Sequence, residues 1–177
     1  MIGRMREGRM AGFRGARAGF SLMELVVSIA ILAVLAGVLV PVMGNKLAAS
    51  RDARRINDCK TMCQAVESYL LDKGSLPAHD SEGGYGGWDT SIDNRMVTQL
   101  VDSRYLREHL RDPMNDTTYH YRYYKYSEGY EGFTSNFYVL GVKAFETTGY
   151  ANTRGSWKGT SRDWTGEFAY VTGGTEK

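Results

Sequence analysis

The longest apolar run of the chain lies near its N-terminus. Leu25–Met43 contains no charged side chain, and Phe20–Met23 extends the run to the roughly 20 residues that a membrane-spanning helix needs. One acid, Glu24, lies inside this segment. An ionisable side chain is costly to place in lipid, so we expect Glu24 to have a functional partner. Because the segment is apolar on all sides, it predicts a membrane anchor.

Beyond the anchor the pattern becomes amphipathic. Asn45–Lys73 contains neither Pro nor Gly, and its apolar residues recur at spacings of three and four, which predicts a helix with one apolar face. Gly74 is a predicted C-terminal cap and Pro77 a stop signal. The predicted apolar face consists of Ile56, Cys59, Cys63, Val66 and Leu70. The charged residues expected on a solvated surface at the start of this helix are Arg51, Asp52, Arg54, Arg55 and Asp58.

Two residues are predicted to soften the helix between these segments. Pro41 removes a backbone hydrogen bond, and Gly37, one turn earlier, loosens the helix further. We therefore expect one long helix from Phe20 to about Lys73 that is curved or locally melted near Pro41.

The C-terminal half is predicted to form a small sheet. A short helical region is expected over Ser91–Leu110, and β-rich residues follow in Tyr119–Tyr126 and Phe137–Val142. The Gly-containing loop Ser127–Ser135 between these runs predicts an antiparallel hairpin, and Glu167–Thr172 is a candidate third strand. If one face of this sheet covers the apolar face of the helix, the fold class is α+β.

Composition agrees with one modest globular domain and an anchor. The 177 residues are 42% hydrophobic, with a net charge of +2, which gives no general case for nucleic-acid binding. Five arginines precede the apolar run, which favours a cytoplasmic N-terminus, although Lys46 and three further arginines soon follow it. Those five are Arg4, Arg6, Arg9, Arg14 and Arg17.

The sequence contains few residues that could form a catalytic or metal-binding site. His79, His109 and His120 are scattered, and the chain has no metalloprotease, phosphate-loop or nucleophile-elbow motif, so an enzyme is not expected. Cys59 and Cys63, four residues apart on a helix, match neither a redox nor a zinc motif, and we interpret them as packing residues. No cofactor or metal is expected. Calcium stays open because Asp80, Glu82 and Asp89 are acids in a Gly-rich loop that lacks the EF-hand spacing.

Aromatic residues are frequent in the C-terminal half. Trp88, Trp157 and Trp164 are interpreted first as core residues of a small β domain. Basic residues lie between the aromatic ones, so a face that binds DNA, glycan or another surface is the alternative. These basic residues are Arg122, Lys125, Lys143, Arg154 and Lys158.

The string Gly19-Phe20-Ser21-Leu22-Met23-Glu24, followed by the apolar run and Pro41, resembles the signal of type IV pilins and of type II secretion pseudopilins. Met23 stands where Ile or Val is commoner. The resemblance implies that a prepilin peptidase cuts after Gly19 and methylates Phe20. It also implies that Glu24 meets the amino terminus of a neighbouring subunit during assembly.

The resemblance implies a domain order and a function. The domains would be a cleaved basic leader (1–19), a transmembrane and filament-core helix (20–43), its amphipathic continuation (44–74) and an α+β head (75–177). The chain would cross the cytoplasmic membrane once with its N-terminus inside, and then enter an extracellular or periplasmic filament. Its partners would be identical or related pilins, the peptidase and an inner-membrane assembly platform.

Weaker matches extend to the head, at Leu76-Pro77, Asp112-Pro113 and Tyr138-Val139-Leu140-Gly141. Glu146–Asp163 poorly reproduces the calcium loop of major pseudopilins, which favours a type IV pilin. A secretion pseudopilin remains an alternative, as does a membrane-anchored binding module that does not polymerise.

Overall fold

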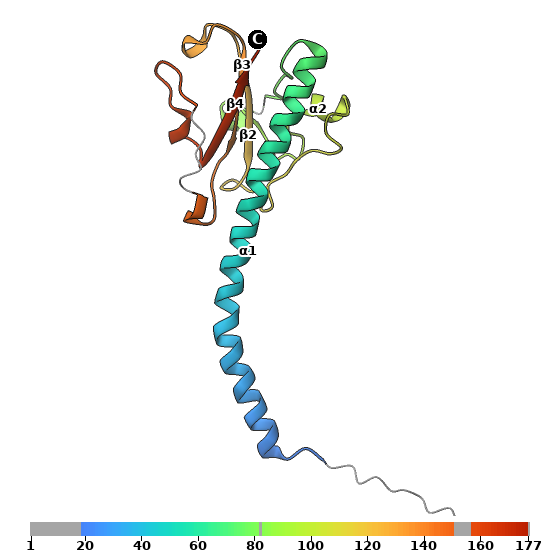
Figure 1. The fold of residues 1–177 in the computed structure, drawn as a ribbon, viewed down its shortest axis with the longest axis vertical. Helices are drawn as coiled ribbons and strands as arrows, with labels where there is room; N and C mark the ends of the chain where they lie inside the picture. Colours follow the sequence, from blue (N-terminus) through green and yellow to red (C-terminus); the bar gives the residue numbers. More distant parts are fainter. Residues whose placement is uncertain (1–18, 82, 151–156, 177) are drawn as a thin grey trace, which may run out of the picture. The chain divides into compact units, whose positions relative to one another are not determined.

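The computed structural model describes residues 19–81, 83–150 and 157–176 (Figure 1). The predicted leader lies outside these residues except for Gly19. Contacts divide the chain after Pro41 into two compact units, and each is described by itself.

The helix α1 includes Leu22–Lys73. Its backbone is helical through Gly37 and Pro41, so the local melting expected there is not seen in this structure. The predicted end of the helix is confirmed: Gly74 has a φ of 72°, and its N–H donates to the Leu70 carbonyl at 2.8 Å. A residue without Cβ adopts this left-handed conformation at little cost, which ends the helix here.

The second unit contains a four-stranded antiparallel sheet in the order β1-β2-β3-β4 (Figure 1). The predicted hairpin is confirmed, since β2 (Tyr121–Tyr126) pairs with β3 (Phe137–Val142). The third strand, β4 (Tyr170–Thr175), lies three residues beyond its predicted position. A fourth strand, β1 (Asp89–Thr90), was not predicted, because two residues carry no periodicity.

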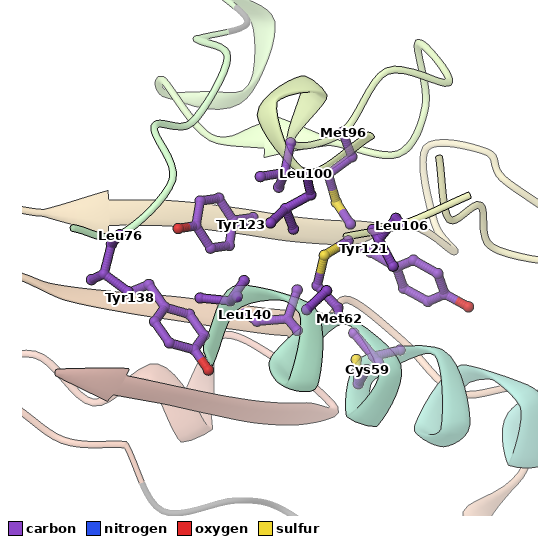
Figure 2. Close-up of a cluster of buried hydrophobic side chains, with 14 residues drawn as sticks. Cys59, Met62, Leu76, Met96, Leu100, Leu106, Tyr121, Tyr123, Tyr138 and Leu140 are labelled. Atoms are coloured by element: carbon purple, nitrogen blue, oxygen red, sulfur yellow. The ribbon is translucent and has the colours of Figure 1, made fainter. Parts of the chain in front are cut away.

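A hydrophobic core lies between α1 and the sheet, where helix residues pack with alternate residues of β2 and β3 (Figure 2). Cys59 and Val66 are buried as predicted, whereas Cys63 and Leu70 are only partly buried. The helix also buries Met62, which the predicted apolar face omitted. The cluster includes Cys59, Met62, Ala65, Val66, Tyr121, Tyr123, Tyr138, Leu140 and Val142.

The opposite face of the sheet carries a second, aromatic cluster that includes Phe137, Val139 and Phe168. Trp88 and Trp164 are buried in it, which confirms that they are core residues, and Trp157 is partly buried against it. A Cβ at Gly141 would stand 2.3 Å from the Phe168 ring, so this strand position has room only for glycine.

The helix predicted over Ser91–Leu110 is mostly wrong. Only Thr98–Asp102 forms a helix, α2, and the backbone takes positive φ angles at Val97 and Arg104 on either side of it. Apolar residues of this segment nevertheless reach the core, where Met96, Val97 and Leu100 are fully buried. Tertiary burial decided the packing of this segment, and its local turns stopped the helix.

Candidate functional site

The predicted processing and assembly residues lie at the start of α1. Gly19 and Phe20 precede the helix, and the Phe20 side chain is 80% exposed. The N–H of Leu25 donates to the Ser21 carbonyl at 3.1 Å. Glu24 lies in the first helical turn, where the helix dipole favours a negative charge. The described residues provide no cation near it, so a partner for Glu24 stays a prediction.

None of the described residues covers the apolar part of α1. Its most apolar window of 18 residues has a mean hydropathy of 2.9, and none of it is buried. Leu22, Val34 and Val40 are each more than 60% exposed. By length and composition this segment is able to cross a membrane. An exposed apolar surface of this extent is stable only against lipid or against other apolar chains.

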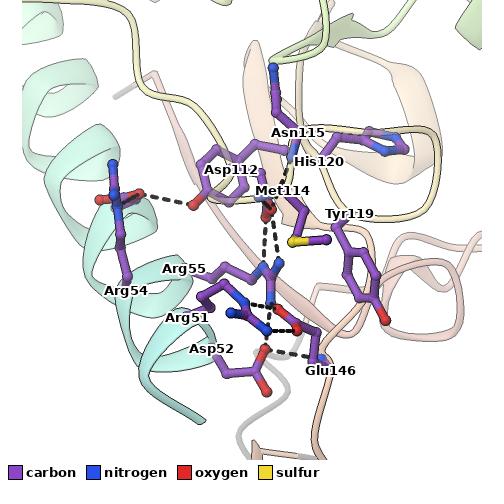
Figure 3. A network of polar contacts seen from close by, with 12 residues as sticks. Arg51, Asp52, Arg54, Arg55, Asp112, Met114, Asn115, Tyr119, His120 and Glu146 are labelled. Atoms are coloured by element: carbon purple, nitrogen blue, oxygen red, sulfur yellow. Dashed lines mark hydrogen bonds and ion pairs between the residues drawn. The ribbon is translucent and has the colours of Figure 1, made fainter. Parts of the chain in front are cut away.

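A buried ionic cluster was missed by the sequence analysis, which expected Asp52 and Arg55 to be solvated. Both side chains are 0% exposed (Figure 3). The Arg55 guanidinium donates to both oxygens of Asp112, at 2.6 and 2.8 Å, and to Asp52 and Glu146 at 2.6 and 2.8 Å. These contacts fix α1 to the loops that precede β2 and follow β3. A buried arginine with such partners holds its charge, and the carboxylates raise the pKa of Arg55 against the opposing effect of burial.

Backbone groups complete the cluster. Asp52 accepts hydrogen bonds from the Glu146 and Thr147 N–H groups at 3.0 and 2.9 Å. The Arg51 side chain also holds Glu146, and this hydrogen bonding lowers the pKa of Glu146 to about 2. The cluster was hard to predict because Asp112 and Glu146 lie 57 and 91 residues from Arg55, beyond the reach of any local pattern.

The polar side of α1 continues into the core at Asp58. Asp58 forms an ion pair with Arg54, one helical turn earlier, at 3.5 Å, but it is buried and accepts a hydrogen bond from the Tyr121 hydroxyl at 2.9 Å. Burial raises the pKa of Asp58. The expectation of a solvated residue is therefore wrong for Asp58 and correct for the exposed Arg54.

The two cysteines are free thiols. Cys59 is 2% exposed in the core, which agrees with a packing role, and its burial raises its pKa well above the usual range. Cys63 is partly buried, and its sulfur lies 3.8 Å from the Thr172 hydroxyl. Burial also raises the pKa of Cys63, so neither thiol is activated as a nucleophile.

Of the three candidate calcium ligands, Asp80 and Asp89 lie within the described residues. Asp89 is buried, and its carboxylate accepts from the N–H groups of Asp80 and Val97 at 3.0 and 2.8 Å. The loop around it is thus less solvated than expected. Glu82 and Arg154, named above as a candidate ligand and a basic residue, lie outside the described residues. Within the ranges that the structure describes, no group of three metal-binding side chains occurs, so calcium stays untested.

Comparison with known proteins places the N-terminal segment in a defined class. Residues 14–40 match the family described as the prokaryotic N-terminal methylation motif. The match covers the predicted cleavage site, Glu24 and most of the apolar run. Most of the exposed apolar part of α1 thus lies within the segment that matches this motif.

Three curated relatives show which kinds of protein the chain is similar to. The chain is 31% identical to fimbrial protein EcpC of Eikenella corrodens over 48% of its own length and 54% of the relative's. It is 33% identical to type IV major fimbrial protein FimA of Dichelobacter nodosus, over 41% and 44%. It is 39% identical to type II secretion system core protein G of Pectobacterium carotovorum subsp. carotovorum, over 38% and 42%.

The chain spans about half the length of these curated relatives. No solved structure matches it. In its methylation motif, in part of its sequence and in having a long helix packed on an antiparallel sheet, the chain is similar to type IV pilins and type II secretion pseudopilins.

Proposed function

We propose that the chain is a structural subunit of a type IV pilus or pilus-like filament and assembles through the first part of α1. The observation that carries the proposal is that the apolar window of α1 is fully exposed, while the second unit already forms two hydrophobic clusters from its own residues. The head needs no part of this window for its own core. The methylation motif and the names of the relatives support the same function.

The proposed path begins in the cytoplasmic membrane. The chain inserts with its N-terminus inside, the prepilin peptidase cuts after Gly19, and the new terminal residue, Phe20, is methylated. On an inner-membrane assembly platform, the apolar helices of identical or related pilins then exchange lipid for one another. Gly37 and Pro41 are proposed to let the helix soften as it leaves the bilayer.

Glu24 is proposed to direct the addition of each subunit. A carboxylate that enters an apolar fibre core needs a cation, because its desolvation is otherwise uncompensated. Cleavage after Gly19 creates one at the Phe20 amine. Pairing between Glu24 and the Phe20 amine of a neighbour fixes the stagger of adjacent helices. In this mechanism the subunit has a structural and not an enzymatic role.

Two variants separate processing from assembly. Gly19→Ala should leave the leader attached in mass spectra of the membrane-extracted chain, and it should yield no filaments. Glu24→Ala should be processed to an N-methylated Phe20 and still assemble poorly. Glu108→Ala, which removes an exposed glutamate of the head, should assemble normally. Normal filament yield from Glu24→Ala would remove the pairing step, and normal processing and yield from Gly19→Ala would refute the proposal.

A second candidate is a pseudopilin of a type II secretion system, which the similarity to core protein G favours. Deletion of the gene distinguishes the two: loss of surface filaments supports a pilin, and loss of protein export with surface filaments intact supports a pseudopilin. A processed chain that never polymerises would instead support a membrane-anchored binding module for DNA or glycan.

A further inference from the structure

A groove of about 610 Å³ lies on the face of β2 that is turned away from the core of α1. Arg122 and Tyr124 line it, and they alternate along β2 with Tyr121 and Tyr123, which face that core. A cavity of this volume is within the usual range for small-molecule sites. The other groove residues used below are His79, Tyr85, Tyr126, Tyr130 and Arg162.

Arg122 is the distinctive group of the groove. Its side chain is partly buried, and no carboxylate of the described residues lies within ion-pair distance of it, Glu82 being outside those residues. Burial lowers the pKa of Arg122, whereas hydrogen bonding to Glu167 raises that of Arg162. Glu167 acts on Arg122 electrostatically from beyond ion-pair distance, but the Glu167 oxygens are held by Arg162. A partly desolvated guanidinium without a directly paired anion is a binding position for one.

Neighbouring side chains hold this guanidinium in place. The Arg122 Nε–H donates to His120 Nε2 at 2.9 Å, and the guanidinium lies 5.3 Å from the centre of the Tyr85 ring. His120 Nδ1 is 3.0 Å from the Asp116 carbonyl, to which it donates when Nε2 is the acceptor. Among the described residues this network uses only the Nε–H of Arg122, which leaves its two terminal nitrogens for a bidentate anion.

The balance of charge favours one anionic group and not a polyanion. Arg162 is held by both oxygens of Glu167, at 2.6 and 2.8 Å. The Lys125 ammonium donates to the Leu76 carbonyl at 3.0 Å and lies 3.3 Å from Glu176. Nucleic-acid strands are bound by several free cations, whereas among the described residues that line this groove only Arg122 has no directly paired carboxylate.

The arrangement of the rings also disfavours nucleic-acid bases. His79 stacks on Tyr124 with ring centres 3.9 Å apart, and Tyr126 packs against both Tyr130 and Phe137 at 4.8 and 4.9 Å. These rings already use one another as stacking partners, which an inserted base would have to displace. Tyr130 is 41% exposed with one face on Tyr126, so its other face is a platform for a flat apolar surface such as one side of a sugar ring.

We propose that this groove binds a carboxylated sugar residue, with the Arg122 guanidinium pairing with the carboxylate and Tyr130 packing against the sugar ring. The fork of an arginine matches the two oxygens of a carboxylate, which gives the site its selectivity over neutral sugars. The inference concerns the head alone and does not depend on filament assembly.

The test is calorimetric titration of the full chain in detergent micelles with an oligogalacturonide. Its methyl ester, which has the same rings without the charge, is the matched ligand control. The acid should bind and the ester should bind at least about tenfold more weakly, as expected for the loss of one charge-assisted hydrogen-bonded pair. Arg122→Gln should weaken binding of the acid by a similar factor, whereas Arg95→Gln, an exposed arginine elsewhere on the head, should not change it.

Further variants keep the test independent of folding. Circular dichroism shows whether Arg122→Gln is folded, and Tyr130→Ala, at an exposed ring, should weaken both the acid and the ester. No heat of binding with the acid, or equal affinity for acid and ester, would overturn the proposal. It would also be overturned if a single-stranded oligonucleotide bound in an Arg122-dependent way while the oligogalacturonide did not.

Discussion

Arg55→Met should be the most damaging single substitution in the ionic cluster. The change keeps a long apolar side chain but removes four hydrogen bonds, two to Asp112 and one each to Asp52 and Glu146. The Asp52 and Asp112 side chains are fully buried, so water cannot replace the lost cation.

The size of the effect follows from the charges that remain. The cluster holds Arg51 and Arg55 against three carboxylates, so its net charge changes from −1 to −2. Removing one partner of a buried ion pair costs about 3–5 kcal/mol. Asp52 keeps hydrogen bonds to backbone N–H groups, which places the expected loss near the lower end of that range.

Arg51→Met is the matched control. Arg51 contacts the same Glu146, but its side chain is 33% exposed, so its loss should lower the free energy of unfolding less than the loss of the fully buried Arg55. Urea unfolding of the full chain in micelles, followed by the fluorescence of the buried Trp164, measures both variants. With a urea dependence of about 1–3 kcal/mol per molar, Arg55→Met should lower the midpoint by at least about 1 M. If the two variants unfolded at the same midpoint, the reasoning about uncompensated buried charge would be wrong.

Two further predictions concern the head. Folding lowers the pKa of Glu146 from 4.5 to about 2, so its ionised form stabilises the head above pH 4.5, and this contribution is lost as the pH falls towards 2. The difference in urea midpoint between the parent and Glu146→Gln should therefore shrink between pH 4.5 and pH 2. A difference that stayed constant over this interval would contradict the prediction. Gly141→Ala should lower the free energy of unfolding by about 1–3 kcal/mol, because the added methyl group overpacks against Phe168. Gly84→Ala, where the added methyl group meets open space, should change the thermal midpoint little. If the two variants had the same thermal midpoint, the close approach of Phe168 to Gly141 would be wrong.

Local patterns predicted those parts of the fold that local forces determine. The end of α1 at Gly74 and the bounds of β3 followed from a cap and from a continuous β-rich run. The segment Ser91–Leu110 was misjudged because its apolar residues reach the core through turns and not through helical spacing. The spacing of apolar residues therefore predicts which residues are buried more reliably than it predicts the backbone conformation of the segment.

The candidate sites divide in the same way. Gly19, Phe20 and Glu24 were predicted from sequence because their motif is contiguous, and their roles stay predictions. Arg55 was placed on the solvated surface because charge near a helix start normally is solvated, and nothing local indicates carboxylates that arrive from distant loops. Among the described residues Arg122 has no carboxylate within ion-pair distance, and this too depends on tertiary structure, because it is decided by which acids fold near it.

The long sequence separations in the ionic cluster also constrain the order in which the chain matures. As the polypeptide emerges, the apolar face at Cys59–Val66 has no cover until Tyr121–Leu140 has been made, and Arg55 has no complete set of acids until Glu146 follows. Such non-local contacts form late and slowly. For most of its synthesis the nascent head therefore exposes the apolar face of its helix. Aggregation at this stage is avoided by a chaperone or by rapid completion of the C-terminal strands.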